Sequence, residues 1–259
     1  MTTQAFLLEA LGIEKRYDKF VALAGVDLRV RANTVHSVIG PNGAGKTTLF
    51  HMLTGTKHVS GGRIVFDGHD VTREPDHRRV QRGMARSFQV TSLFPTLPVR
   101  ENLRLAAQGT RPRQAFDAWH PPVGARARDE AVARVLARLG LERHADTPAS
   151  NLSHGQQRRL EVGMALAAGP KAIFLDEPTS GMGIDDLDDM KRLIQGLKDE
   201  HTVVLIEHNM NIVMDISDTV TVMQQGRVLA EGHPHAIRND DRVRSAYLGN
   251  MITGGGAAS

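Results

Sequence analysis

The stretch that decides the fold is Gly40-Pro41-Asn42-Gly43-Ala44-Gly45-Lys46-Thr47, which stands between a strand-like and a helix-like segment. Residues 34–39 are rich in β-branched side chains and predict a strand, and residues 47–53 place Leu49, Met52 and Leu53 on one helical face. The spacing G-x-x-x-x-G-K-[ST] in this setting predicts a loop that wraps around phosphate groups.

Each residue type of this loop has a physical role in holding phosphate. Glycines let backbone N–H groups turn inward, Lys46 adds a positive charge, and Thr47 offers a hydroxyl to Mg²⁺. The following helix presents its positive end to the anion. The alternative is a glycine-rich turn that binds nothing. We expect nucleotide contacts from Gly40, Pro41, Asn42, Gly43, Ala44, Gly45, Lys46, Thr47 and Thr48.

A second polar site follows the apolar run of residues 172–175, where Asp176 and Glu177 stand side by side. Ligands of open α/β sheets bind beyond the carboxyl ends of the strands. Asp176 is expected to hold Mg²⁺ through a water molecule, and Glu177 to orient and polarise the water that attacks a phosphate. By itself an Asp-Glu pair is more often a solvated turn, so the prediction depends on the phosphate loop.

The remaining pattern predicts an α/β protein with a mainly parallel core sheet. Residues 202–206 form another continuous apolar strand, and residues 185–198 a helix between it and the acidic strand. Alternation in residues 26–30 and 62–66 predicts antiparallel strands, and residues 219–230 predict a closing hairpin. Between these regions we expect a helical insert, with a surface loop at 108–128 and a helix at 129–141.

Composition limits the class of protein. The 259 residues carry 32 Lys+Arg and 29 Asp+Glu, so the formal charge is 32 − 29 = +3. A charge this small does not indicate any particular class of binding partner. Cysteine is absent, which excludes disulfides, cysteine-ligated metals and a thiol nucleophile. No apolar run approaches the roughly 18 residues that span a bilayer, and the N-terminus lacks the pattern of an export signal. We expect a globular, unexported chain.

The segment Leu152-Ser153-His154-Gly155-Gln156 resembles the signature sequence of the ATP-binding subunits of ABC transporters. The phosphate loop, this signature and the acidic strand occur in the order that this family has, and the resemblance covers residues 6–250. It implies an ABC-type P-loop NTPase with an antiparallel β subdomain. The implied division is a core plus β subdomain at about 6–93 and 166–250, a helical insert at about 94–165, and a flexible tail at 251–259.

The resemblance also implies a shared site, in which ATP lies between the phosphate loop of one subunit and the signature of another. Ser153 and Gln156 have the spacing of a capping box, so a helix is expected to begin there with its positive end outward. By resemblance Tyr17 stacks on adenine, Gln89 contacts Mg²⁺ or the attacking water, and His208 contacts the γ-phosphate. Alone, a histidine is more often structural and an exposed glutamine indicates nothing, while the alternative for Tyr17 is a tyrosine of the core or of an edge strand.

Two departures from the family pattern stand out. His154 replaces the first glycine of the signature, and residues 180–185 lack the aspartate that usually crosses the dimer or displace it to Asp185. A further stretch carries several arginines, which we interpret as a solvated helix face rather than a nucleic-acid site: Arg78, Arg79, Arg82 and Arg86.

Residues 86–89, 206–210 and 246–249 resemble those of bacterial branched-chain amino-acid importer ATPases. This implies an ATP hydrolase that uses Mg²⁺, a second ATPase subunit, two membrane permeases docked near residues 89–102, and indirectly a periplasmic or extracellular binding protein. The expected location is the cytoplasmic face of the bacterial inner membrane. Related subfamilies carry urea or amides or export lipopolysaccharide, so the substrate stays open. The alternative is a soluble ABC ATPase that acts in assembly or on nucleic acid, or a regulatory module without turnover.

Overall fold

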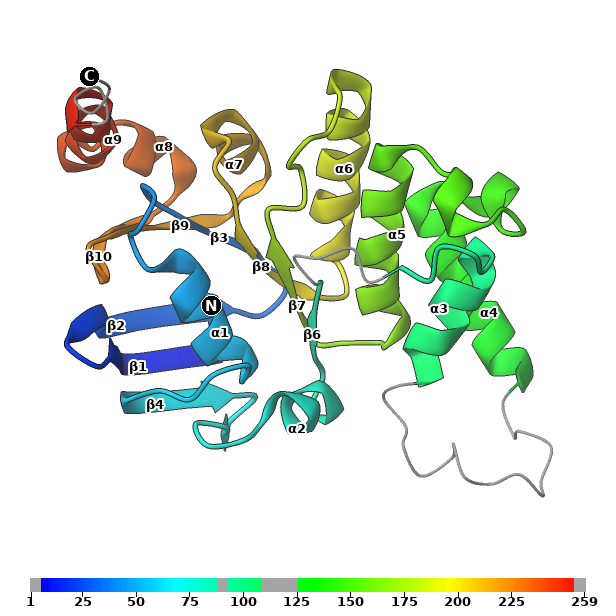
Figure 1. The fold of residues 1–259 in the computed structure, drawn as a ribbon, viewed down its shortest axis with the longest axis horizontal. Helices are drawn as coiled ribbons and strands as arrows, with labels where there is room; N and C mark the ends of the chain where they lie inside the picture. The colour runs from blue at the N-terminus through cyan, green and yellow to red at the C-terminus, as the bar shows by residue number, and fades with distance from the viewer. Residues whose placement is uncertain (1–5, 88–92, 109–124, 254–259) are drawn as a thin grey trace, which may run out of the picture.

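The computed structural model describes residues 6–87, 93–108 and 125–253. Gln89 and the end of the predicted tail lie outside the described residues. Two sheets form the framework (Figure 1). A six-stranded sheet has the order β10-β9-β3-β8-β7-β6, with strands β3 (Val35–Ile39), β6 (Met84–Arg86), β7 (Ala172–Asp176), β8 (Thr202–Ile206), β9 (Thr219–Gln224) and β10 (Arg227–Gly232).

The six-stranded sheet is parallel except at one edge. Strands β9, β3, β8, β7 and β6 run parallel, and β9 and β10 form the predicted antiparallel hairpin. Strands β3, β7 and β8 are buried at every position, as expected where helices or another sheet cover both faces. The predicted fold class, a P-loop α/β core with a mainly parallel sheet and a separate antiparallel sheet, is confirmed.

The antiparallel sheet has the order β2-β1-β4-β5, with β1 (Phe6–Tyr17), β2 (Phe20–Arg31), β4 (Gly61–Phe66) and β5 (His69–Asp70). Helix α1 (Lys46–Thr54) lies between the two sheets (Figure 1). Its Leu49, Phe50 and Leu53 belong to one buried cluster with residues of β1, β2, β4, β7 and β8. The helix that follows the phosphate loop is therefore packed on both sides, which fixes the loop.

Helices cover the opposite face of the parallel sheet (Figure 1). Helices α5 (His154–Ala167), α6 (Ile184–Leu197) and α7 (Met210–Ile216) share a second apolar cluster with β3, β7 and β8, which also includes residues of α3 (Val99–Gln108) and α4 (Ala125–Leu139). Helix α2 (Asp76–Gln81) precedes β6, and 3-10 turns occupy Glu142–His144 and Ala149–Asn151. The helical region predicted between the sheet segments is present in the described residues.

The C-terminal helices α8 (Pro234–Arg238) and α9 (Asp241–Thr253) pack on the β9–β10 edge. Helix α9 reaches Thr253, so the tail predicted from residue 251 begins inside a helix. Among the described residues, no helix is long and apolar enough to cross a membrane.

Three expectations need correction. Helix α4 begins at residue 125, not 129, and ends at Leu139, because Gly140 takes a positive φ that stops the helix. The loop predicted at 108–128 is therefore shorter at its C-terminal end, and residues 109–124 lie outside the described residues. The strand β1 carries the longest antiparallel pairing of the N-terminal sheet, yet it was not among the predicted strands.

The arginine stretch is not a solvated helix face. Arg79 is 1% exposed, and its guanidinium donates to the carbonyl oxygens of Met52 (2.7 Å) and Leu53 (2.6 Å) at the C-terminal end of α1. Burial lowers the pKa of Arg79 to about 10. A positive charge at this end of α1 complements the helix dipole. Of the four arginines only Arg78 is exposed.

Candidate functional site

The phosphate loop joins the end of β3 to the start of α1. Gly40 has φ 149, and a Cβ there would lie 2.2 Å from the carbonyl oxygen of Met223 on β9, so only glycine fits. Gly45 is the N-cap of α1, and the first N–H groups of the helix have no partner inside it. The loop therefore presents backbone donors and the positive end of a helix at one point.

A cavity of about 300 Å³ opens above this loop. It brings together segments that are distant in the sequence: the loop and the first residues of α1, the ends of β7 and β8, and the β1–β2 hairpin. Its lining consists of Phe20, Ala22, Asn42, Gly43, Ala44, Gly45, Lys46, Thr47, Thr48, Glu177 and His208. Nine of the sequence-predicted site residues thus line one cavity.

The Lys46 ammonium reaches back over the loop and donates to the carbonyl oxygens of Gly40 (2.7 Å) and Pro41 (3.0 Å). Burial lowers the pKa of Lys46, and the charges of Glu177 and Asp176 act in the opposite direction. Gly40 and Pro41 therefore hold the lysine rather than line the cavity. The ammonium is thus held at the loop, close enough to Glu177 and Asp176 for their charges to act on it, and it offers a positive charge to a phosphate chain.

Glu177 and His208 contact each other at the wall of the cavity. The imidazole Nε2 of His208 lies 2.5 Å from Oε1 of Glu177, and the two residues follow the adjacent strands β7 and β8. Glu177 has φ 50, a left-handed conformation that is strained for a residue with a side chain. This backbone turn directs the carboxylate out of the sheet edge and into the cavity, where His208 holds it.

Asp176 is the last residue of β7, and its side chain is fully buried. Its Oδ2 lies 3.3 Å from Nη2 of Arg86, while Oδ1 is buried without a hydrogen-bond partner. Burial raises the pKa of Asp176, and the charge of Arg86 opposes the rise. An unpaired buried carboxylate oxygen and the Thr47 hydroxyl fit the oxygen ligands that Mg²⁺ prefers. The third predicted ligand, Gln89, lies outside the described residues.

Glu207 is a buried carboxylate next to His208 that sequence reasoning did not single out. It is buried and accepts hydrogen bonds from N–H and Oγ1 of Thr179 (3.1 and 2.5 Å) and from N–H of His208 (3.0 Å). It therefore ties the loop after β7 to the loop after β8, next to the Glu177–His208 pair. The available signal was a carboxylate directly after a continuous apolar strand.

Tyr17 and Phe20 are directly paired across the β1–β2 hairpin. The ammonium groups of Lys15 and Lys57 each lie 5.1 Å from the centre of the Tyr17 ring. Phe20 is 65% exposed and lines the phosphate cavity, whereas Tyr17 is not part of that lining. Sequence reasoning selected Tyr17 and did not single out Phe20, because an aromatic residue in a strand gives no sign of which ring borders a cavity.

The signature segment forms the N-terminus of α5. Ser153 and Gln156 make the predicted capping box: Gln156 N–H donates to Ser153 Oγ (3.2 Å), and Ser153 N–H donates to Gln156 Oε1 (2.9 Å). No residue of the 153–156 signature contributes to the described lining of the phosphate cavity. The same chain therefore carries two separate phosphate-compatible helix ends.

The two departures from the family pattern meet in space. The imidazole of His154 faces Gly181, where an added Cβ would lie 3.3 Å from the imidazole Cε1. An added Cβ at Gly155 would lie 2.1 Å from the carboxyl carbon of Asp186, in the first turn of α6. The second signature glycine is thus required by close packing, and Asp185 stays exposed beside it.

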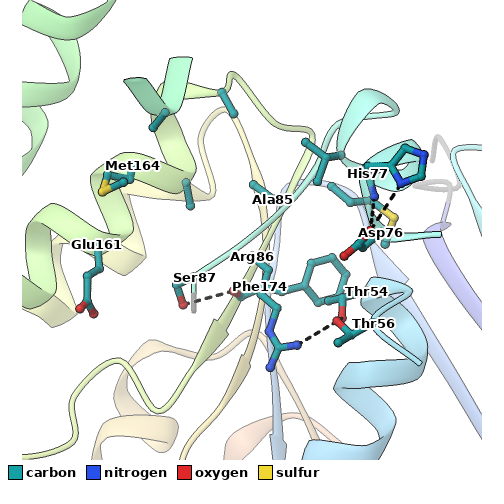
Figure 2. Close-up of a pocket in the computed structure, with 15 residues that line it drawn as sticks. Thr54, Thr56, Asp76, His77, Ala85, Arg86, Ser87, Glu161, Met164 and Phe174 are labelled. Atoms are coloured by element: carbon teal, nitrogen blue, oxygen red, sulfur yellow. Dashed lines mark hydrogen bonds and ion pairs between the residues drawn. The ribbon is translucent and has the colours of Figure 1, made fainter. Parts of the chain in front are cut away.

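A second cavity, of about 370 Å³, opens beside β6 and α5 (Figure 2). Its wall is mainly apolar and includes Met84, Phe174 and Met164. Arg86 lies at its edge and donates to Thr56 Oγ1 (3.2 Å), and Ser87 Oγ donates to the Phe174 carbonyl oxygen (3.4 Å). We call this cavity the β6–α5 pocket.

A phosphate loop with Lys46, a carboxylate at the end of the neighbouring strand, and a histidine that contacts it define a P-loop ATPase. Comparison with known proteins gives the family. The "ABC transporter" family profile matches residues 23–180, and the "Branched-chain amino acid ATP-binding cassette transporter" profile matches residues 227–251. The chain belongs to the ABC transporter family and is an ABC-type ATPase.

Individual relatives span nearly the whole chain. It is 41% identical to the high-affinity branched-chain amino acid transport ATP-binding protein BraF of Pseudomonas aeruginosa, over 94% of this chain and 98% of BraF. Identity to the lipopolysaccharide export system ATP-binding protein LptB of Escherichia coli is 33%, over 93% and 97% of the two chains. The ADP conformation of a solved ATP-binding cassette has a TM-score of 0.82 and 30% identity, over 95% and 99%.

Proposed function

We propose that this ATPase powers the import of branched-chain amino acids or related amino acids and amides through separate permease subunits. The observation that carries its catalytic part is the lining of one cavity by Lys46, Glu177 and His208. The match of residues 227–251 to the branched-chain profile, and the higher identity to BraF than to LptB, support the substrate class and the import direction.

In the proposed reaction the loop residues 40–48 bind the phosphates of ATP through backbone N–H groups, and Lys46 supplies the charge for the terminal phosphates. Glu177 orients and polarises the attacking water and receives its proton as the bond from the water oxygen to the γ-phosphorus forms; the bond from the γ-phosphorus to the bridging oxygen breaks, and ADP leaves with that oxygen. His208 holds the Glu177 carboxylate and contacts the γ-phosphate. Tyr17, with Phe20 beside it, contacts adenine.

Thr47 and Asp176 are the described residues that would hold Mg²⁺, with Asp176 acting through a water molecule and Gln89 as the third predicted contact. Bound with the nucleotide, the ion would neutralise phosphate charge. The unpaired Oδ1 of Asp176 supports this role.

A second ATPase subunit, either an identical copy or a paralogue, completes the proposed site. The N-terminal cap of α5, with its N–H groups and the Ser153 hydroxyl, does not belong to the described lining of the chain's own phosphate cavity, which suits a site for a partner's γ-phosphate. His154, Gly155 and Gln156 belong to the same contact. Enclosure of the nucleotide between two subunits would exclude all water from the site except the attacking molecule.

The permeases are proposed to dock on the β6–α5 pocket and the neighbouring segment at about 89–102. The pocket joins the end of the sheet to helices α3 and α5, so an inserted segment would contact both parts of the chain at once. In this proposal the chain works at the cytoplasmic face of the bacterial inner membrane, and a periplasmic or extracellular binding protein acts on the permeases. No nucleic-acid partner is expected.

The test is co-purification of tagged Glu177→Gln protein from its native membranes with ATP and Mg²⁺, with every bound protein identified by mass spectrometry. Loss of the base slows hydrolysis by about 10²- to 10⁴-fold and leaves ATP in place. Two permeases and a second ATPase subunit are the expected companions. Recovery of soluble proteins or nucleic acid alone would contradict the importer proposal.

The matched control is Lys46→Ala, which removes charge from the phosphates in the ground state as well as in the transition state. It weakens ATP binding itself, so nucleotide-dependent companions should be lost from this variant and kept in Glu177→Gln. A Glu177→Gln protein that hydrolyses ATP at the normal rate would refute the assignment of the base.

A further inference from the structure

Arg86 lies between the β6–α5 pocket and the buried carboxylate of Asp176. Its Nη1 donates to Thr56 Oγ1 (3.2 Å) at the edge of the pocket, as Figure 2 shows, and its Nη2 donates to Asp176 Oδ2 (3.3 Å). The Arg86 side chain is 14% exposed and that of Asp176 is fully buried. One guanidinium therefore contacts both Thr56 at the edge of the pocket and the buried carboxylate of Asp176.

The Arg86–Asp176 pair is a weak ion pair by its geometry. Charge-assisted N–H···O bonds usually measure about 2.7–2.9 Å and are often bidentate. Here one nitrogen meets one oxygen at 3.3 Å, and Arg86 Nε and Asp176 Oδ1 are both buried without partners. By contrast, Arg82 holds Glu74 through two bonds of 2.7 and 2.6 Å. Arg86 thus has unused donor capacity and Asp176 has unused acceptor capacity.

We propose that Arg86 is a positioning residue that holds Asp176 by one oxygen and, through its positive charge, weakens the affinity of this carboxylate for a divalent cation. The inference rests on the proposed role of Asp176 in holding Mg²⁺. A unit charge in contact with the same carboxylate repels the incoming cation, and burial makes that repulsion stronger than in water. Thr56 limits the effect, because it holds the guanidinium partly toward the pocket.

A purely structural role for Arg86 would be to fasten β6 to β7. The two strands are already paired in parallel register from Met84–Ala172 to Arg86–Phe174, and the N–H of Ser87 donates to the carbonyl oxygen of Phe174 (2.9 Å). Loss of a structural contact would lower the thermal midpoint and affect nucleotide binding equally with and without metal. A charge effect on Asp176 changes only the contribution of the metal to nucleotide binding.

The test is calorimetric binding of ADP to the full chain, once with Mg²⁺ and once with EDTA. The dissociation constant with EDTA divided by the dissociation constant with Mg²⁺ isolates the contribution of the metal, and this ratio rises as the metal strengthens binding. Arg86→Gln, which keeps a polar side chain and removes the charge, should raise this ratio at least about tenfold. Arg86→Lys restores a charge and should return the ratio to within about threefold of the wild-type value.

Two further variants make the result decisive. Thr56→Val frees the guanidinium to move onto Asp176, so the ratio should fall. Arg82→Gln removes an arginine of the same stretch that does not contact Asp176, so this variant should leave the ratio unchanged. A ratio in Arg86→Gln that is unchanged or lower overturns the proposal. If the wild-type protein binds ADP with no dependence on Mg²⁺, the inference also falls, whereas a wild-type protein that binds no ADP refutes the proposed function itself.

Discussion

The substitution Glu207→Gln tests whether this buried carboxylate positions Glu177 and His208, the proposed catalytic residues. Both oxygens of Glu207 accept hydrogen bonds: Oε1 from Thr179, and Oε2 from the N–H groups of His208 and Asn209. Glutamine offers one oxygen and one NH₂ group. In either orientation the NH₂ group faces backbone N–H donors and cannot accept from them.

The expected loss follows from these contacts. A hydrogen bond to a charged group contributes about 1.5–3 kcal/mol, and the substitution removes one side of the Glu207 bridge, so we expect a loss of roughly 2–3 kcal/mol in unfolding free energy. The loops carrying Glu177 and His208 then shift relative to each other, and a displacement of this kind costs about 10- to 100-fold in kcat. Because Glu207 is not part of the phosphate cavity lining, KM for ATP should change little.

The assay is steady-state phosphate release at varied ATP concentration, with the thermal midpoint measured in parallel. Glu231→Gln is the matched control, because Glu231 also accepts from a threonine hydroxyl (Thr221, 2.7 Å) but lies on β10. A folded Glu207→Gln protein with normal kcat, or one in which only KM rises, would refute the positioning role.

Two other predictions concern the aromatic pair and a buried histidine. Tyr17→Ala and Phe20→Ala should each weaken ATP binding by about 3- to 30-fold in calorimetry, as expected for loss of a stacking ring, while Tyr17→Phe should bind normally. If only one of the alanine variants binds more weakly, adenine contacts that ring alone. Burial lowers the pKa of His36, on β3, to about 4 from an ordinary value of 6.5. Between these values the unfolded chain binds more protons, so stability is lost as pH falls, by about 2 kcal/mol between pH 7.5 and 5. Urea unfolding of the wild-type protein and of His36→Gln at both pH values checks this; an equal loss in the two proteins would show that His36 is not the group responsible.

The phosphate loop, the acidic strand and the capping box were predictable because each depends on local sequence. Residues 40–47 must carry glycines where the backbone turns, and Ser153 and Gln156 lie within one helical turn of each other. The continuous apolar runs of β7 and β8 likewise require burial on both faces, which indicated the parallel sheet.

What the sequence did not reveal depends on long-range packing. Arg79 is buried because the end of α1, more than twenty residues earlier in the chain, presents carbonyl oxygens to it. Phe20 reaches the phosphate cavity only because the β1–β2 hairpin folds over the loop. Glu207 and Thr179 meet because β7 and β8 are neighbours in the sheet. Polarity and periodicity along the chain carry no information about such partners.

The position of Arg86 has a thermodynamic consequence beyond this one subunit. Thr56, at the edge of the β6–α5 pocket, and the buried Asp176 contact the same guanidinium. Suppose that an acceptor group on a docked permease draws Arg86 off Asp176 and raises metal affinity by some factor. The closed cycle of binding steps then requires the metal-bound nucleotide to tighten permease docking by the same factor. A shared arginine would make the affinity of the ATPase for its permease depend on the nucleotide and metal that the ATPase has bound.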